Sequence, residues 1–233
     1  MQIPKTIHRI WIGDPEPNWL REFGDSWRTH HPDWSHLRWT DRVESETDRD
    51  IQSLMPLDNH DIWEQAERWV DRGHLYQLKS DLLRYTILNR FGGLYVDADF
   101  LCLKPIDPLV KDLRCFAAWE LEGMWAANGL LGSTPAHPFI QAVIAGISKQ
   151  VHKYKGHKVT PTKLTGPQYI TAVVREVGGC TMLPQRNFFP YGYRDVRLHK
   201  IDEDFSKREE LFAVHVWHNR RRKLGMLDLR EVE

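Results

Sequence analysis

Several marks of common protein classes are scarce or missing in this sequence. The three cysteines, Cys102, Cys115 and Cys180, are an odd number and show no C-x-x-C spacing. This argues against both a disulfide framework and a zinc site, and it favours a reducing compartment. The chain also has no net charge, with 32 basic and 32 acidic residues. No overall field would attract nucleic acid or an acidic membrane, so we expect no nucleic-acid partner.

Long hydrophobic runs are missing as well. No run reaches the roughly 18 apolar residues of a membrane span, and the N-terminal residues lack the apolar stretch of a secretory signal. We therefore expect a cytoplasmic protein without a transmembrane segment. Neither a P-loop nor a kinase glycine-rich loop is present, which leaves a Mg²⁺- or Mn²⁺-dependent phosphotransferase as a minor alternative.

The pattern at the start of the chain indicates an α/β fold. Residues 3–12 alternate as in a strand and are followed by a helical pattern over 19–30 and a short strand over 37–40. A strand, helix and strand in this order suggest one half of a nucleotide-binding fold with parallel strands. Because 233 residues contain no repeat or linker, we expect a single domain over 1–233.

The rest of the chain continues the alternation of helices and strands. Residues 43–72 are charged with helical spacing and predict a helical insertion, and an apolar stripe predicts a helix over 75–91 that ends at Gly92-Gly93. Further strands are predicted over 94–96, 115–119, 129–131 and 212–217, further helices over 139–151 and 166–177, and a basic tail over 219–233.

Two carboxylates, Asp97 and Asp99, follow the short strand over 94–96. Residues two apart on an extended backbone point the same way, and converging carboxylates repel unless a cation lies beside them. A hard divalent ion, Mg²⁺ or Mn²⁺, suits such oxygen ligands, and the carboxyl end of a strand is where α/β sheets bind ligands. The alternative is a pair of solvated loop acids.

Asp81 and Arg84 lie three residues apart on the preceding helix. They share one face of it and could reach the same site as the two acids. A surface ion pair is the alternative.

Residues 80–107, SDLLRYTILNRFGGLYVDADFLCLKPID, resemble the signature of the DXD-containing glycosyltransferases that use sugar nucleotides. This group includes α-1,4-galactosyl- and N-acetylglucosaminyltransferases, initiating α-1,6-mannosyltransferases and the catalytic domains of glucosylating toxins. IPKTIHRIWIG at 3–13 and FAVHVW at 212–217 resemble two further segments of the family.

The resemblance implies a GT-A type fold, Rossmann-like, with a central mostly parallel sheet. It implies an enzyme that uses Mn²⁺ or Mg²⁺ to transfer a hexose from a nucleotide sugar with retention of configuration. A UDP-sugar is the expected donor, and GDP-mannose is left open. The expected acceptor is a glycan or another hydroxyl compound.

The resemblance also implies roles for individual residues. Asp97 would contact the ribose and the metal ion, and Asp99 would hold the metal ion. Asp81 and Arg84 would bind hydroxyls of the donor sugar, with Arg84 also near the phosphate. Asp81, Arg84, Asp97 and Asp99 thus form the expected catalytic set. Trp11 matches a ring that stacks on uracil in the toxins, with core packing as the alternative.

Four more residues complete the expected site. Ile10 is placed in the donor site with its neighbour Trp11, and Tyr95 backs the donor pocket or packs in the core. Asn128 faces the donor sugar or is a turn residue before Gly129. His215 is expected as a third metal ligand, with a core histidine as the alternative; because His218 stands where many members have Ser or Asn, the last metal ligand is left open.

Two other functions compete with transfer. A nucleotide-sugar hydrolase would use the same site without an acceptor, and a non-catalytic sugar-nucleotide or glycan-binding module would not need metal ligands. The basic run over 220–223 could bind diphosphate, contact an anionic membrane peripherally or form a solvated tail.

Overall fold

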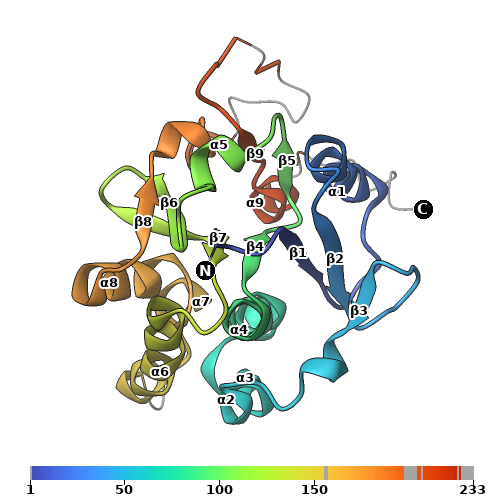
Figure 1. Cartoon of the computed structure of the whole chain (residues 1–233). Helices are drawn as coiled ribbons and strands as arrows, with labels where there is room; N and C mark the ends of the chain where they lie inside the picture. The colour runs from blue at the N-terminus through green and yellow to red at the C-terminus, as the bar shows by residue number, and fades with distance from the viewer. Residues whose placement is uncertain (1, 155–156, 197–203, 206, 225, 227–233) are drawn as a thin grey trace.

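The computed structural model describes residues 2–154, 157–196, 204–205, 207–224 and 226. Its centre is a seven-stranded sheet in the order β3-β2-β1-β4-β7-β6-β8. All neighbouring strands pair in parallel except where β7 meets β4 and β6. Helices cover both faces, with α4 and α6 on one side and α1, α5 and α9 on the other (Figure 1). The expected mostly parallel α/β sheet is therefore confirmed.

The first half of the sheet follows the predicted order. Strand β1 (Thr6–Trp11) leads through helix α1 (Asn18–His30) to β2 (Ser35–Thr40), and β1 and β2 pair in parallel over their whole length. Phe23 and Trp27 of α1 are buried against this sheet.

The predicted helical insertion is partly wrong, because it also contains the edge strand of the sheet. β3 (Asp48–Asp50) pairs in parallel with β2. Only short helical segments follow, and they are η1 (Ile51–Leu54), α2 (His60–Glu64), α3 (Ala66–Trp69) and η2 (Arg72–His74). The sequence did not indicate this strand, because a charged residue such as Asp48 is not expected in a buried position. In the structure the Asp48 carboxylate is buried in a contact with Arg38.

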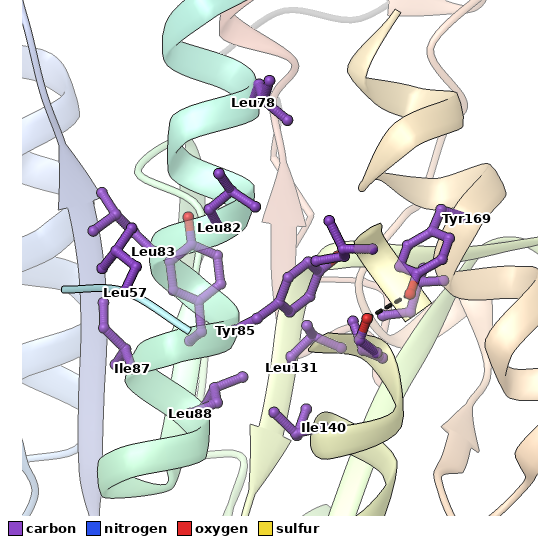
Figure 2. Close-up of a cluster of buried hydrophobic side chains, with 14 of the residues drawn as sticks. Leu57, Leu78, Leu82, Leu83, Tyr85, Ile87, Leu88, Leu131, Ile140 and Tyr169 are labelled. Atoms are coloured by element: carbon purple, nitrogen blue, oxygen red, sulfur yellow. Dashed lines mark hydrogen bonds between the residues drawn. The ribbon is translucent and has the colours of Figure 1, made fainter. Parts of the chain in front are cut away.

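Helix α4 (Leu75–Phe91) has the predicted bounds. It ends where Gly92 takes a φ of 65°, and the Gly92 N–H donates to the Leu88 carbonyl. The predicted apolar stripe is too narrow, since residues 81–88 are buried on every side, polar ones included. Leu82 and Leu88 pack in one cluster with Leu131 and Ile140 (Figure 2).

Strand β4 (Gly93–Val96) leaves α4 directly and lies in the middle of the sheet beside β1 and β7 (Trp125–Ser133). β7 pairs in turn with β6 (Cys115–Leu121). The remaining helices are α5 (Asp107–Val110), α6 (Pro138–Lys153), α7 (Pro161–Leu164) and α8 (Pro167–Val177).

Strand β8 (Thr181–Leu183) escaped prediction because its three residues carry no alternating pattern. It pairs with β6, and the 3₁₀ turn η3 (Gln185–Asn187) follows it. The three cysteines are free thiols.

The predicted final strand is shorter than expected and lies outside the central sheet. β9 (Ala213–His215) pairs with β5 (Phe100–Cys102) in a separate two-stranded sheet. This pairing brings residue 215 next to the loop that carries the two acids.

The basic segment is not simply a tail. Residues 218–223 form helix α9 (His218–Lys223), and Arg221 is 2% exposed. The Arg221 guanidinium donates to the Val216 carbonyl at 2.6 Å and to the Tyr191 hydroxyl at 3.2 Å. Arg221 thus has a structural role, while residues 227–233 of the predicted tail lie outside the described residues. None of the described helices combines the length and the apolar character that a membrane crossing requires.

Candidate active site

The two acids lie on the turn between β4 and β5, at the carboxyl end of the central strand. The Asp97 N–H donates to the Gly129 carbonyl at 2.8 Å, which fixes the turn against β7. A Cβ atom at Gly129 would lie 2.4 Å from Oδ2 of Asp97. Glycine at 129 therefore leaves the space that the Asp97 carboxylate occupies.

Asp99 points toward the β5–β9 ribbon. Its Oδ1 lies 3.0 Å from Nε2 of His215, and its Oδ2 accepts the His218 N–H at 2.8 Å. Burial alone would raise the pKa of Asp99, but His215 and the His218 N–H outweigh it, so the pKa is lowered. Burial would lower the pKa of His215, but Asp99 and the nearby carboxylates raise it.

Together, Asp97, Asp99 and His215 could hold a metal ion. One ligand atom from each residue lies within 4.8 Å of the others. Two carboxylates and one imidazole are a donor set that divalent ions such as Mn²⁺ accept, with positions left for phosphate oxygens or water. The residues present therefore fit the expected metal ion.

A buried ionic network on α4 adjoins this cluster. Arg84 is 4% and Asp81 2% exposed, so the alternative of a surface ion pair is wrong. Nη2 of Arg84 lies 3.1 Å from Oδ1 of Asp97 and 3.3 Å from Oδ1 of Asp81. Arg84 Nη1 donates to the Asn128 carbonyl at 2.7 Å. The guanidinium thus connects the helix, β7 and the first acid of the motif.

Both carboxylate oxygens of Asp81 are already hydrogen-bonded. Oδ1 accepts from the Asn128 amide at 2.8 Å, and Oδ2 accepts from the Thr165 hydroxyl at 2.6 Å. Burial raises the pKa of Asp81 to about 6, although Arg84 and the hydrogen bonds oppose the shift. Asn128 lies within β7 and is 7% exposed, so the alternative of a turn residue is wrong.

Tyr95 is buried and also takes part in the site. Its hydroxyl donates to Oδ1 of Asp97 at 2.7 Å, and the Arg84 guanidinium lies 4.5 Å from its ring centre. Burial raises the pKa of Tyr95, so the phenol stays a hydrogen-bond donor at neutral pH. Tyr95 both packs in the core and orients the first acid.

Trp11 and Ile10 end β1, the neighbour of β4. Trp11 is partly buried, and its Nε1–H donates to the Asp14 carbonyl at 2.6 Å. The Trp11 ring meets the His218 ring edge-on at 6.1 Å between centres. This places Trp11 beside the residue whose N–H binds Asp99. Ile10 is 5% exposed and belongs to the same core cluster as Tyr95.

Sequence reasoning missed three groups of this site. Thr165, which binds Asp81, comes just before the Gly166-Pro167 turn, and that turn was the available signal. The His218 N–H turns toward Asp99 because Trp217 takes a φ of 59°, which no local pattern predicts. Glu120 of β6 is a half-buried carboxylate near His215 and Asp97.

This chain is similar in sequence to known glycosyltransferases. Residues 17–115 match the family described as a glycosyltransferase sugar-binding region containing a DXD motif. Inositol phosphoceramide mannosyltransferase 1 of Schizosaccharomyces pombe is 30% identical over 175 residues, which are 73% of this chain and 50% of the relative. Lactosylceramide 4-alpha-galactosyltransferase of Rattus norvegicus is 26% identical over 196 residues, 72% of this chain and 50% of the relative. The chain thus spans about half the length of these two curated relatives.

Solved structures agree on the fold. The PaToxG glycosyltransferase superposes with a TM-score of 0.59 at 20% identity, over 76% of this chain and 71% of its own. The UDP-bound glycosyltransferase domain of the YGT toxin superposes with a TM-score of 0.61 at 11% identity, over 88% of each chain. The resemblance to the DXD glycosyltransferases is confirmed: residues 17–115 of this chain match the sugar-binding region of that family, and the fold is one that solved glycosyltransferases share.

Proposed function

We propose that this chain is a metal-dependent glycosyltransferase that moves a hexose from a nucleotide sugar to a hydroxyl group of a glycan or glycolipid. The observation that carries the proposal is the cluster of Asp97, Asp99 and His215 at the carboxyl end of β4, with Arg84 beside it. A non-catalytic sugar-binding module needs no such set of metal ligands, and a pair of solvated acids would not be held by buried partners.

Asp97, Asp99 and His215 would hold Mn²⁺ or Mg²⁺, which when bound neutralises the charge that develops on the diphosphate leaving group. The imidazole in the set favours Mn²⁺ over Mg²⁺, because Mg²⁺ prefers oxygen ligands. The protein groups around the ion have separate tasks. Tyr95 and Arg84 orient the Asp97 carboxylate, and the His218 N–H orients Asp99.

Arg84 and Asp81 are the groups that would meet the donor sugar. Arg84 stays charged, because Asp97, Tyr95 and Asp81 raise its pKa against the effect of burial. A planar guanidinium can bind two oxygens at once, which suits a sugar hydroxyl and a phosphate oxygen. Asp81 and Asn128 hold one another and so present a fixed polar wall on the same side.

We propose a UDP-sugar as the donor, with Trp11 stacking on the uracil. Trp11 ends β1, the strand that pairs with β4, and its hydrogen bond to Asp14 holds the ring in place. The carboxyl ends of such strands are where α/β sheets bind ligands. Tyr76, which is 52% exposed, lies with its ring against Gly13 in the same region. A GDP-sugar is the competing donor, since a purine could stack on the same ring.

The proposed acceptor is a sugar or polyol hydroxyl, on a glycan or on the headgroup of a sphingolipid. Two curated relatives bear the names of an inositol phosphoceramide mannosyltransferase and a lactosylceramide galactosyltransferase, which supports mannose or galactose as the transferred hexose. We propose retention of configuration by a front-face reaction in which the leaving phosphate assists. Hydrolysis of the donor would be the side reaction of the same site.

A donor panel tests the function. The protein is incubated with UDP-glucose, UDP-galactose, UDP-N-acetylglucosamine and GDP-mannose in Mn²⁺, with and without inositol phosphoceramide or lactosylceramide. Nucleotide release, product mass and thermal protection by each donor are measured. Release that needs Mn²⁺ and rises with an acceptor supports transfer, and release that ignores the acceptors supports a hydrolase. Thermal protection without any release would show a binding module and would sink the proposal.

For location we propose the cytoplasm, on the ground of the three free thiols. Imaging of the tagged protein in its own cell tests this, and a signal confined to a membrane-enclosed compartment would contradict it.

A further inference from the structure

Glu120 occupies an irregular position in the sheet next to the site. Trp119 of β6 pairs with Ala126 of β7, and Leu121 pairs with Trp125. β6 thus advances two residues while β7 moves by one, so Glu120 is the extra residue of a β-bulge. Bulges bend a strand and redirect a side chain, and they are frequent beside active sites.

The alternation of side chains along β6 places Glu120 on the same face as Phe116 and Ala118. Phe116 and Ala118 precede it on that face and belong to the core cluster around Phe100 and Phe189, whose rings pack on His215. Trp119 belongs to the cluster on the opposite face.

The carboxylate of Glu120 has a charged environment but no direct partner. Burial raises the pKa of Glu120, His215 lowers it and Asp97 raises it, and Glu120 in turn raises the pKa of His215. Among the described residues, no hydrogen bond or ion pair reaches this carboxylate. The Glu120 carboxylate is only half-buried, so its oxygens remain available to accept a hydrogen bond from a ligand hydroxyl.

Access to Glu120 comes from the tip of the β6–β7 hairpin. Leu121 and Met124 on either side of the tip are 42% and 52% exposed. Arg84, Asp81 and Asn128 instead surround the acids from the side of α4. The two sets of groups approach the metal cluster from different elements of the fold.

We propose that Glu120 binds the acceptor: its carboxylate accepts a hydrogen bond from the hydroxyl that is to be glycosylated. The inference rests on the proposed transferase function and assigns the acceptor side of that site to the β6–β7 hairpin. In the reaction, the acceptor oxygen bonds to the anomeric carbon while the bond from that carbon to the phosphate oxygen breaks. The electron pair of the broken bond stays on the diphosphate, and the hydroxyl proton passes to a diphosphate oxygen on the same face. Glu120 orients the hydroxyl and is not consumed.

Kinetics of Glu120→Ala and Glu120→Gln test the assignment, with Glu67→Gln on exposed α3 as the matched control. Transfer is measured with the active donor and acceptor of the panel, varying acceptor, donor and Mn²⁺ in turn. Loss of a hydrogen bond to a charged group predicts a fall in kcat/KM for the acceptor of roughly 10- to 100-fold in Glu120→Ala. Glu120→Gln should fall less, because its amide oxygen still accepts a hydrogen bond. Donor KM and the Mn²⁺ midpoint should stay at wild-type values.

The other outcomes have separate meanings. A shift in the Mn²⁺ midpoint as large as the loss of transfer would assign Glu120 to the metal ion and overturn the inference. Unchanged acceptor kinetics, or a change in melting temperature alone, would overturn it as well. A wild-type chain that neither transfers nor hydrolyses would contradict the proposed function first, whereas an active wild type with an equally active Glu120→Ala contradicts the acceptor site alone.

Discussion

Arg84→Lys is the variant that best tests how the site works. The wild-type guanidinium contacts the Asn128 carbonyl at 2.7 Å, Asp97 at 3.1 Å, and Asp81 and the Ser80 carbonyl at 3.3 Å each. A lysine ammonium keeps the charge but cannot span acceptors on three elements, since its donors radiate from one nitrogen. The variant should therefore keep one carboxylate contact and lose at least two of the others.

The expected loss of stability follows from those contacts. Each hydrogen bond to a charged group contributes about 1.5–3 kcal/mol, so the loss of two such bonds should lower the free energy of unfolding by roughly 3–6 kcal/mol. For a chain of this size each kcal/mol shifts the melting temperature by about 2–4 °C, and we expect a decrease of roughly 6–24 °C. An exposed ion pair would contribute at most about 1 kcal/mol. Arg68→Lys on exposed α3 is the control and should melt like the wild type.

The effect on rate separates catalysis from stability. Arg84 should bind the phosphate more tightly as charge moves onto the leaving group, so the variant should lower kcat more than it raises donor KM. We expect a fall in kcat of roughly 10- to 100-fold, measured well below the melting temperature. A wild-type kcat with a lowered melting temperature would refute the catalytic role and leave Arg84 as a structural ion.

Three further predictions concern the metal ion, the base and the buried acid. Asp99→Asn should abolish Mn²⁺-dependent turnover and leave circular dichroism unchanged, because it removes a charged metal ligand while the amide of the same shape can still accept the His218 N–H; full turnover of the wild type in excess EDTA would contradict this. Trp11→Ala should weaken UDP binding by about 1–3 kcal/mol in calorimetry, the range for stacking of a base on an aromatic ring. An unchanged affinity would show that Trp11 packs in the core and does not stack on the base. The folded pKa of Asp81, about 6, lies above its ordinary value of 3.8, so its contribution to stability is most favourable below pH 4 and falls as the pH rises through 6. Chemical denaturation should show wild type losing about 2 kcal/mol relative to Asp81→Asn between pH 4 and 6.5, and parallel curves would contradict the buried assignment.

Local patterns in the sequence were enough to predict the helix, the strand and the acid turn at the centre of the site. A helix that ends at a glycine with positive φ, followed at once by a short apolar strand and two acids, is specified within residues 75–99 by capping and periodicity. These interactions join residues close in sequence. The order of α4, β4 and the acid turn, and the position of Asp81 and Arg84 on one helix face, can therefore be read from the sequence. The predicted bounds of α1 and α4 are accurate for the same reason.

The positions of the other site residues depend on contacts between segments far apart in the sequence. His215 reaches Asp99 because β9 pairs with β5 across more than a hundred residues, and Thr165 reaches Asp81 from the start of another helix. The sequence predicted neither the strand over 48–50 nor the burial of Arg221. Both depend on charged side chains whose partners lie elsewhere in the chain. Glu120 lies near His215 and Asp97 only once β6 has paired with β7 in the sheet. The residue types and local elements therefore follow from sequence, whereas the convergence of Asp97, Asp99, His215 and Glu120 depends on strand register, which the free energy of the whole packed sheet determines.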